Sequence, residues 1–434
     1  MGAAHNAGVA VEVATSGRID PRQVAGLKRL RHLLPLLEPL RQVGCGRDAA
    51  GNRELHFDQY VTLVLLYLFN PLIGSVRALQ QAAAIDKVSE QLGVKRFSLG
   101  SFSESVRVFD PEKLKAVIGQ LAGEMRPVNA DPRLAEHLDG PLKLADGTVL
   151  DAIATVAKAA WLPLQDGTAK HAWRLHVQFD FDTFLPEEVE LSDARNSGES
   201  DEKNVLRKKL KAGCCYVTDR WFAQFVLFNQ VNAIASSYVC RVKENSAFEV
   251  TEERLLDEAA LEAGVVRDAV VSMGLGSKPA LRPDHPVRLV VVEAEPHAKR
   301  GGRRGKTAGP GNKGLVLIAT NLLDAPAHVV ALIYHHRWAI EVFFRFFKQV
   351  LGCRHLLSHK PEGVMIQVYC AVIACMLINL WTGKKPNKRT VEMLAFYFMG
   401  VASEKEVLGH LNRPDNTGVK LRAKDELWKK LGVE

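Results

Sequence analysis

Residues 334–348 read Tyr-His-His-Arg-Trp-Ala-Ile-Glu-Val-Phe-Phe-Arg-Phe-Phe-Lys. On an α-helix, where successive residues advance by roughly 100°, Tyr334, Arg337, Glu341 and Lys348 fall within an arc of about 60°. The adjoining arc is apolar and consists of Ile340, Phe343, Phe344, Phe347 and Leu351. The alternative is a surface helix with solvated charges. We favour a packed helix, because an apolar stripe beside one polar face can hold a carboxylate next to three phosphate-binding groups.

Two further carboxylates stand in contexts typical of strands. Asp146 lies in Leu-Ala-Asp-Gly-Thr-Val-Leu-Asp (residues 144–151), and Asp219 lies in Tyr-Val-Thr-Asp-Arg-Trp-Phe (residues 216–222). We expect both side chains at strand ends, with Glu341 on a helix that packs across them. A lone aspartate at a strand end is more often a turn or cap residue, so neither segment alone indicates chemistry.

Taken together and in chain order, the three segments resemble the DDE transposases of the insertion-sequence-four family, with its Tyr-x2-Arg-x3-Glu-x6-Lys signature. Lesser matches are Arg174-Leu-His176 and Thr320-Asn321-Leu322, and the resemblance covers about residues 50–400. His176 has two readings, a residue close to the site or a core histidine.

The resemblance implies a catalytic, metal-binding triad of Asp146, Asp219 and Glu341. Three carboxylates on separate elements suit Mg²⁺, which takes hard oxygen ligands, and Mn²⁺ is expected as a substitute. The expected DNA-phosphate-binding residues are Tyr334, Arg337, Lys348, Arg220 and Arg345. For Arg220 a salt bridge is an equally good explanation.

The implied function is cut-and-paste transposition, in which a strand is cleaved at each element end and the freed 3′-OH attacks DNA. Expected partners are terminal inverted repeats, target DNA and a second copy of the chain in a synaptic complex. Two alternatives stay open: a domesticated nuclease of the same fold without strand transfer, and an inactive DNA-binding repressor of its own element.

Composition is compatible with this function. The 434 residues carry a formal net charge of +8, which suits a polyanionic partner without proving one. Seven scattered cysteines without a Cys-x2-Cys pair predict reduced thiols and a cytoplasmic protein. The N-terminus lacks the pattern of a signal peptide, and the apolar stretch 366–381 is shorter than a usual membrane span. We expect that stretch to be a buried core helix and the protein to have no membrane partner.

The expected fold class is α/β, with an RNase H-like mixed sheet as catalytic core. Residues 131–244 and 316–383 would form this core, in the order three strands, helix, strand, helix, strand. Residues 245–315 are predicted as a β-rich insertion that carries the basic loop 299–306. Residues 384–434 are predicted as a basic helical tail.

Residues 1–130 are predicted as a helical DNA-binding domain. Gly93 breaks one helix, and Ser101 to Glu104 has the form of a capping box that opens the next. This helix pair is expected to expose Ser103, Ser105 and Arg107 for DNA recognition. A generic helical bundle explains the same pattern equally well.

Overall fold

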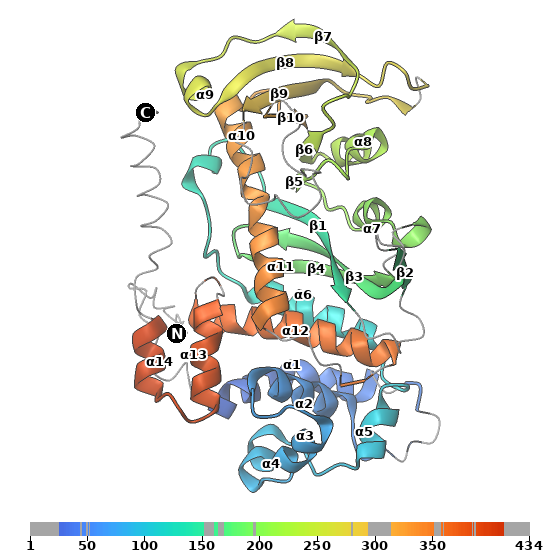
Figure 1. Cartoon of the computed structure of the whole chain (residues 1–434), viewed down its shortest axis with the longest axis vertical. Coiled ribbons are helices and arrows are strands. Elements are labelled where there is room, and N and C mark those ends of the chain that lie inside the picture. The colour runs from blue at the N-terminus through green and yellow to red at the C-terminus, as the bar shows by residue number, and fades with distance from the viewer. Residues whose placement is uncertain are drawn as a thin grey trace, which may run out of the picture.

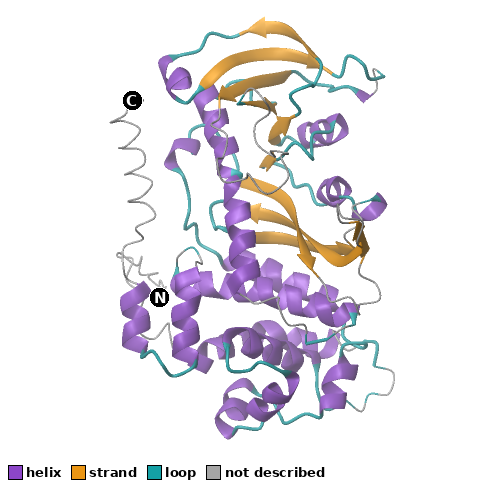
Figure 2. Ribbon diagram, viewed as in Figure 1, coloured by secondary structure: helices purple, strands orange, loops and turns teal. Residues whose placement is uncertain are grey.

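The computed structural model describes residues 26–43, 46–48, 51, 53–151, 160–163, 169–193, 197–278, 281–293, 314–350, 357–358, 360–383, 385 and 388–411. The elements that precede residue 140 are helical, and they gather at one end of the molecule (Figures 1 and 2). The strands of the described residues lie in the rest of the molecule, together with further helices, and form a single sheet of ten strands.

In the part of the chain that the structure describes, six α-helices precede the sheet. They are α1 (Gly26–Val43), α2 (Phe57–Phe69), α3 (Val76–Ala83), α4 (Asp86–Leu92), α5 (Leu99–Ser105) and α6 (Leu114–Glu124). Helix α2 has the predicted bounds, because an almost uninterrupted apolar run buries nearly all of its faces. Helix α4 ends where Gly93 adopts a φ of 63°, a left-handed conformation that favours glycine.

The predicted capping box was wrong in its position. Helix α5 begins three residues earlier than expected, and its N-cap is Ser98, whose side chain accepts a hydrogen bond from the Ser101 amide. Ser105 is also not available to DNA, because it is buried and its hydroxyl accepts a 2.7 Å hydrogen bond from Arg53. The helix that was expected to read DNA is therefore short and carries part of its polar side inward.

The sheet has the order β2-β3-β1-β5-β6-β10-β9-β8-β7, with β4 paired to β3. Its strands are β1 (Leu142–Asp151), β2 (Ala160–Pro163), β3 (Ala169–Asp180), β4 (Leu185–Asp193), β5 (Cys215–Thr218), β6 (Ser237–Val242), β7 (Phe248–Glu253), β8 (Val265–Met273), β9 (Val287–Glu293) and β10 (Leu315–Thr320). Strands β1, β5 and β6 are parallel, whereas β3 and β4 join as antiparallel neighbours. The predicted mixed pairing is confirmed.

The predicted insertion is rich in strands, but those strands extend the same sheet. Strand β10 pairs antiparallel with both β6 and β9, so β9, β8 and β7 continue outward from the parallel strands. The sequence did not predict β2 and β7, which are a four-residue strand and a largely exposed edge strand rich in Glu. The basic loop 299–306 lies outside the described residues.

Five helices accompany the later strands, namely α7 (Glu202–Lys208), α8 (Phe225–Ala233), α9 (Glu258–Glu262), α10 (Ala327–His336) and α11 (Trp338–Val350). Helices α12 (Pro361–Thr382), α13 (Lys388–Phe398) and α14 (Glu404–Leu411) follow. Within the described residues, Pro361–Leu380 is long and apolar enough to cross a membrane, and 89% of its apolar window is buried inside the fold. It is the buried core helix that the sequence predicted.

Helix α12 joins the two halves of the molecule. It packs on α2 and α6 from the N-terminal region and on β4 from the sheet. The buried side chains of all these elements belong to one hydrophobic cluster. The helical N-terminal region therefore shares its core with the sheet, and the domain boundary near residue 130 stays a prediction.

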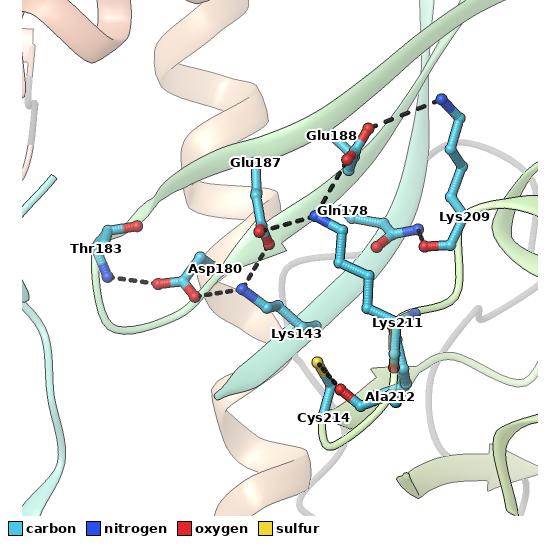
Figure 3. A network of polar contacts seen from close by, with 11 residues as sticks. Lys143, Gln178, Asp180, Thr183, Glu187, Glu188, Lys209, Lys211, Ala212 and Cys214 are labelled. Carbon is cyan, nitrogen blue, oxygen red and sulfur yellow. Dashed lines mark hydrogen bonds and ion pairs between the residues drawn. The ribbon is translucent and has the colours of Figure 1, made fainter. Parts of the chain in front are cut away.

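A charged network fixes the start of β1 (Figure 3). The buried Lys143 ammonium lies 2.7 Å from the Asp180 carboxylate and 2.5 Å from that of Glu187. Lys211, from the loop before β5, pairs with Glu187 at 2.9 Å and with Glu188 at 3.1 Å. Because both lysines share Glu187, the network ties β1, the β3–β4 hairpin and the entry to β5 together, three residues before Asp146.

Candidate active site

The β1–β5 ladder brings Asp146 and Asp219 together. The two parallel strands pair Leu142 with Cys215 and Leu144 with Val217. Two residues further along both chains, the same alignment sets Asp146 beside Asp219. Asp219 directly follows the last residue of β5, as predicted. The expectation that Asp146 ends a strand was wrong, because β1 continues to Asp151 in its pairing with β3.

Helices α10 and α11 carry the third carboxylate across these strands. They meet at Arg337, whose φ of −49° and ψ of −31° keep the backbone right-handed helical, and Figure 1 shows them running on as one rod. The predicted apolar stripe is confirmed for the described residues, since Ile340, Phe343, Phe344 and Phe347 are all buried. Leu351 lies outside the described residues. The buried stripe therefore fixes which way the polar face points.

The Arg337 guanidinium lies between two of the three acidic residues. Its Nη2 is 2.5 Å from Glu341 Oε1, and its Nη1 is 3.8 Å from Asp146 Oδ2. The side chains of Arg337, Asp146 and Glu341 are 14%, 21% and 27% exposed, so all three stay open to solvent at one edge. Residues almost 200 positions apart in the chain thus share one polar site, which is partly open to a ligand.

Burial and crowding of like charges disfavour the ionised form of Asp146. Its pKa is raised from 3.8 to about 7, first by burial and then by the charge of Asp219. The hydrogen bond from the Gly147 amide to Asp146 Oδ1, at 2.8 Å, and the charge of Arg337 act in the opposite direction. A cation bound between these two carboxylates would relieve the repulsion between their charges.

Tyr334 lies in the same polar cluster. Burial raises the pKa of its phenol, while the positive charges of Arg337 and Arg241 lower it. For Arg337, burial lowers the guanidinium pKa, but Tyr334, Glu341 and Asp146 together raise it above its ordinary value. The phenol and the guanidinium are thus held in their neutral and charged forms, respectively, which are the forms that donate hydrogen bonds to phosphate.

The sequence interpretation missed Arg241 in β6. Its Nε is buried and has no hydrogen-bond partner within the described residues, and its Nη2 lies 3.6 Å from Glu244. Its charge acts on Tyr334, so it belongs to the same cluster as Arg337. A signal was present, because Arg241 is the one charged residue in the strand Ser-Tyr-Val-Cys-Arg-Val.

The other three predicted phosphate-binding residues, Arg220, Arg345 and Lys348, are all exposed, but they differ in their neighbours. Arg220 is exposed next to Asp219, whose Oδ1 accepts a 2.8 Å hydrogen bond from the Trp221 amide. Arg345 is exposed and stacks over the Trp338 ring at 5.6 Å. Lys348 is exposed on α11, two turns beyond Glu341.

The predicted recognition residues lie in another part of the molecule. Ser103 in α5 and Arg107, two residues after that helix, are both exposed, and α5 lies among the N-terminal helices in Figure 1. Arg107 pairs with Glu104 at 3.1 Å, and Glu104 also pairs with Lys360 at 3.0 Å. These contacts connect α5 to the start of α12, so the predicted recognition surface is attached to the core.

The acidic residues fit a magnesium site in their chemistry, because carboxylate oxygens are the ligands that Mg²⁺ prefers. Asp146 and Asp219 would hold the ion between them, since burial and then the charge of Asp219 already raise the pKa of Asp146. Over the described ranges, no group of three or more His, Cys, Asp or Glu side chains is arranged to hold a metal ion. Glu341 instead pairs with Arg337, which stands between it and Asp146.

Comparison with known proteins assigns the family. The transposase DDE domain family matches residues 139–377, which is more than half of the chain and includes Asp146, Asp219 and Glu341. The chain belongs to the transposase DDE domain family.

Individual relatives agree with this assignment. The chain is 26% identical over 224 residues to a putative transposase, y4zB, of Sinorhizobium fredii, which covers 51% of this chain and 56% of the relative. It is 24% identical over 307 residues to the probable transposase for insertion sequence element IS5377 of Geobacillus stearothermophilus, covering 70% and 72%. A putative transposase InsL for insertion sequence element IS186A of Escherichia coli is 25% identical over 259 residues, covering 55% and 65%.

The first of these matches spans little more than half the length of that relative. A cryo-EM structure of a piggyBac transposase synaptic complex with hairpin DNA aligns with 92% of this chain and 86% of the chain in that structure. Its sequence identity is 12% and its TM-score 0.42, which is too low to decide the fold.

Proposed function

We propose that this protein is a transposase of the insertion-sequence-four family that cleaves DNA strands at element ends and joins the 3′-OH to target DNA. The observation that carries the proposal is the Arg337 guanidinium between Asp146 and Glu341, with Asp219 beside Asp146. This arrangement combines acidic residues for a metal with cations for a phosphate, which phosphodiester chemistry requires together.

The strand order supports an RNase H-like core. Three antiparallel neighbours, β4, β3 and β1, are followed by the parallel strands β5 and β6. In this order β1 lies between β3 and β5, so that Asp146 within β1 and Asp219 directly after β5 come together at one place. Helix α11 adds Glu341 from the side. A sheet of this topology with three converging acidic residues suits two-metal cleavage of nucleic acid.

Each residue of the centre has a separate task in this proposal. Asp146, Asp219 and Glu341 hold Mg²⁺, or Mn²⁺ in its place. When bound, the metal supplies charge relief on the leaving oxygen and activates the attacking water or 3′-OH. Arg337 and Tyr334 donate hydrogen bonds to the phosphate at the cut, and Arg241 offers a buried Nε that lacks a partner among the described residues.

In this proposal a DNA phosphate competes with Glu341 for Arg337. The 2.5 Å ion pair occupies both side chains while DNA is absent. When the guanidinium turns to a phosphate, Glu341 is released beside Asp146, and the negative charge that remains favours a cation. Binding of DNA would then raise the affinity of the site for metal, and Arg337 would be the side chain that couples the two. The metal-loaded site would form mainly when DNA is bound.

Further assignments rest on the resemblance. The partners are terminal inverted repeats and target DNA, and two copies of the chain hold two element ends in a synaptic complex. Lys348, Arg220 and Arg345 bind phosphates around the cut, while Ser103 and Arg107 contribute to recognition of the ends. The net charge of +8 suits such partners. The working compartment is the bacterial cytoplasm.

The experiment that tests the function uses a plasmid in which a marker lies between the inverted repeats that flank the native gene. Purified protein with Mg²⁺ should cut at both repeat ends and insert the marker into a second plasmid. Cutting without insertion would favour a nuclease of the same fold, and binding without cutting would favour a repressor. Either result would overturn the proposed strand transfer.

A further inference from the structure

Next to Asp146, the chain leaves room for a buried carboxylate from another element. Gly147 follows Asp146 in β1, and a Cβ on it would lie 2.6 Å from Glu202 Oε1, 3.0 Å from Cδ and 3.4 Å from Cγ. Glu202 is the first residue of α7, and only 6% of its side chain is exposed. The carboxylate therefore covers the backbone of Gly147, at the place where any other residue would carry a side chain.

An arginine from the neighbouring strand holds Glu202 there. Arg174 in β3 forms an ion pair and a hydrogen bond with Glu202 Oε1. The β1–β3 register sets Arg174 opposite Val149 and His176 opposite Gly147, so these residues project on the same side of the sheet. The N-cap of α7 adds a second restraint, because the Asp201 side chain accepts a hydrogen bond from the Lys203 amide.

His176 lines the same small pocket as Glu202 and Asp146. The His176 Nε2 lies 2.7 Å from Ser192 Oγ, and burial followed by the charge of Arg174 lowers its pKa to about 4. His176 is therefore neutral at physiological pH and adds no second positive charge. Both interpretations of His176 fit the structure, because it lies beside the site, opposite Gly147, and is buried with a hydrogen bond of its own. Arg174 is thus the cation that balances Glu202.

We propose that Glu202 is a positioning residue of the catalytic centre, clamped by Arg174 onto the bare backbone of Gly147 so that β1 presents Asp146 beside Asp219. This inference rests on the proposed function, because it assigns Asp146 and Asp219 to the metal. The charge of Glu202 also acts on this centre, since it raises the pKa of Asp146, while the charge of Asp219 raises the pKa of Glu202. Glu202 accordingly adds to the negative potential that draws a divalent cation into the site.

The contact between Gly147 and Glu202 predicts that substitutions at these two positions have coupled effects on Mn²⁺ affinity. Gly147→Ala should displace the Glu202 carboxylate and weaken Mn²⁺ binding, since residues that orient a metal ligand typically change affinity by about 10–100-fold. Shortening Glu202 in the same chain removes the obstacle. The Gly147→Ala/Glu202→Ala double variant should therefore bind Mn²⁺ better than the product of the single effects predicts, by at least about threefold.

The test is isothermal titration of the full-length, DNA-free protein with Mn²⁺, with circular dichroism as the check on folding. Glu202→Gln keeps the shape but loses the charge, and its Mn²⁺ affinity should fall about tenfold. Glu202→Asp should lie between wild type and Glu202→Gln. Glu199→Gln is the matched control, because it removes an exposed carboxylate that lies just before α7 and pairs with Lys208, and it should bind Mn²⁺ like wild type.

Two outcomes would overturn the inference: wild-type Mn²⁺ affinity in Glu202→Gln, or strictly multiplicative effects of the Gly147 and Glu202 substitutions. Failure of the proposed function looks different. In that case Asp146→Asn would also leave Mn²⁺ affinity unchanged. If Asp146→Asn abolishes Mn²⁺ binding and Glu202→Gln does not affect it, the metal site is supported and the positioning role of Glu202 is contradicted.

Discussion

Arg337 separates Asp146 from Glu341, with one guanidinium nitrogen 3.8 Å from Asp146 Oδ2 and the other 2.5 Å from Glu341 Oε1. The two carboxylates are therefore not free to share a cation until Arg337 moves. This relationship gives the Arg337 guanidinium two tasks. Without metal it offsets the repulsion between Asp146 and Glu341, and when DNA is present it binds a phosphate.

Substitution of Arg337 should separate these two tasks. Arg337→Gln removes the phosphate-binding charge, so DNA cleavage should fall by at least about a hundredfold, as expected for loss of a charged transition-state contact. Mn²⁺ binding without DNA should become tighter, because Asp146 and Glu341 lose their competing cation. Cleavage assays and metal titration on one preparation would measure both. Weaker binding of Mn²⁺ by Arg337→Gln would contradict the competition between arginine and metal.

The raised pKa of Asp146 predicts how stability depends on pH. The folded protein holds this proton more tightly than the unfolded chain, since the pKa is about 7 in the fold and 3.8 ordinarily. The resulting stabilisation is complete below the ordinary pKa and is lost as the pH rises through about 7. Asp146→Asn avoids this loss and should be more stable than wild type at about pH 8, by on the order of 2 kcal/mol.

Urea unfolding without metal at about pH 8 and about pH 5 measures this difference. The advantage of Asp146→Asn should shrink at the lower pH, where wild-type Asp146 is itself protonated. Added Mg²⁺ should stabilise the wild type at the higher pH and leave the variant unaffected. An advantage that is equal at both pH values would show that charge on Asp146 is not its cause.

Lys348 tests the outer part of the polar face. Lys348→Ala should weaken binding to element-end DNA and lower the slope of log K against log salt by about one unit, because one phosphate contact is lost. Lys405→Ala, an exposed lysine on α14, is the control for a general loss of charge. Equal salt slopes for the two variants and the wild type would place Lys348 outside the DNA-binding surface.

Recognition of the repeats is best tested in the full chain. Helices α2 and α6 pack on α12, so a fragment that ends near residue 126 would lose part of its core. Arg107→Ala should reduce the preference for end repeats over random duplex by about 10-fold, the cost of one lost base contact. Metal-dependent nicking of non-specific plasmid should be unchanged. Full preference for the repeats would direct attention to other basic segments of the chain.

The parts of the fold that the sequence predicted are those set by local pattern. The run Phe57–Phe69 is apolar throughout and folds as the predicted helix, and the stripe from Ile340 to Phe347 is buried as its spacing requires. Asp219 could be placed because Cys215–Thr218 is a short buried strand that must end before a charged pair. Short-range patterns were misleading at Ser101, where Ser98 offered an equally good cap three residues earlier.

The rest depends on pairing between distant segments, which periodicity does not encode. Strands β7, β8 and β9 extend the core sheet because β10 pairs with β9, a contact set by tertiary packing. Glu202 and Arg241 escaped notice for the same reason, since each meets its partners only after α7 and β6 are in place. The one local trace of Glu202 is Gly147, whose missing side chain makes room for it.

The most direct test of the central claim compares Asp146→Asn, Asp219→Asn and Glu341→Gln in Mg²⁺-dependent cleavage of the DNA ends that flank the native gene. Glu249→Gln, in the exposed edge strand β7, serves as the control for loss of a carboxylate. We predict that all three site variants fold and bind end DNA, yet cleave at less than about one-hundredth of the wild-type rate, while Glu249→Gln cleaves normally. Cleavage near the wild-type rate by any of the three would remove that residue from the catalytic centre and contradict the account.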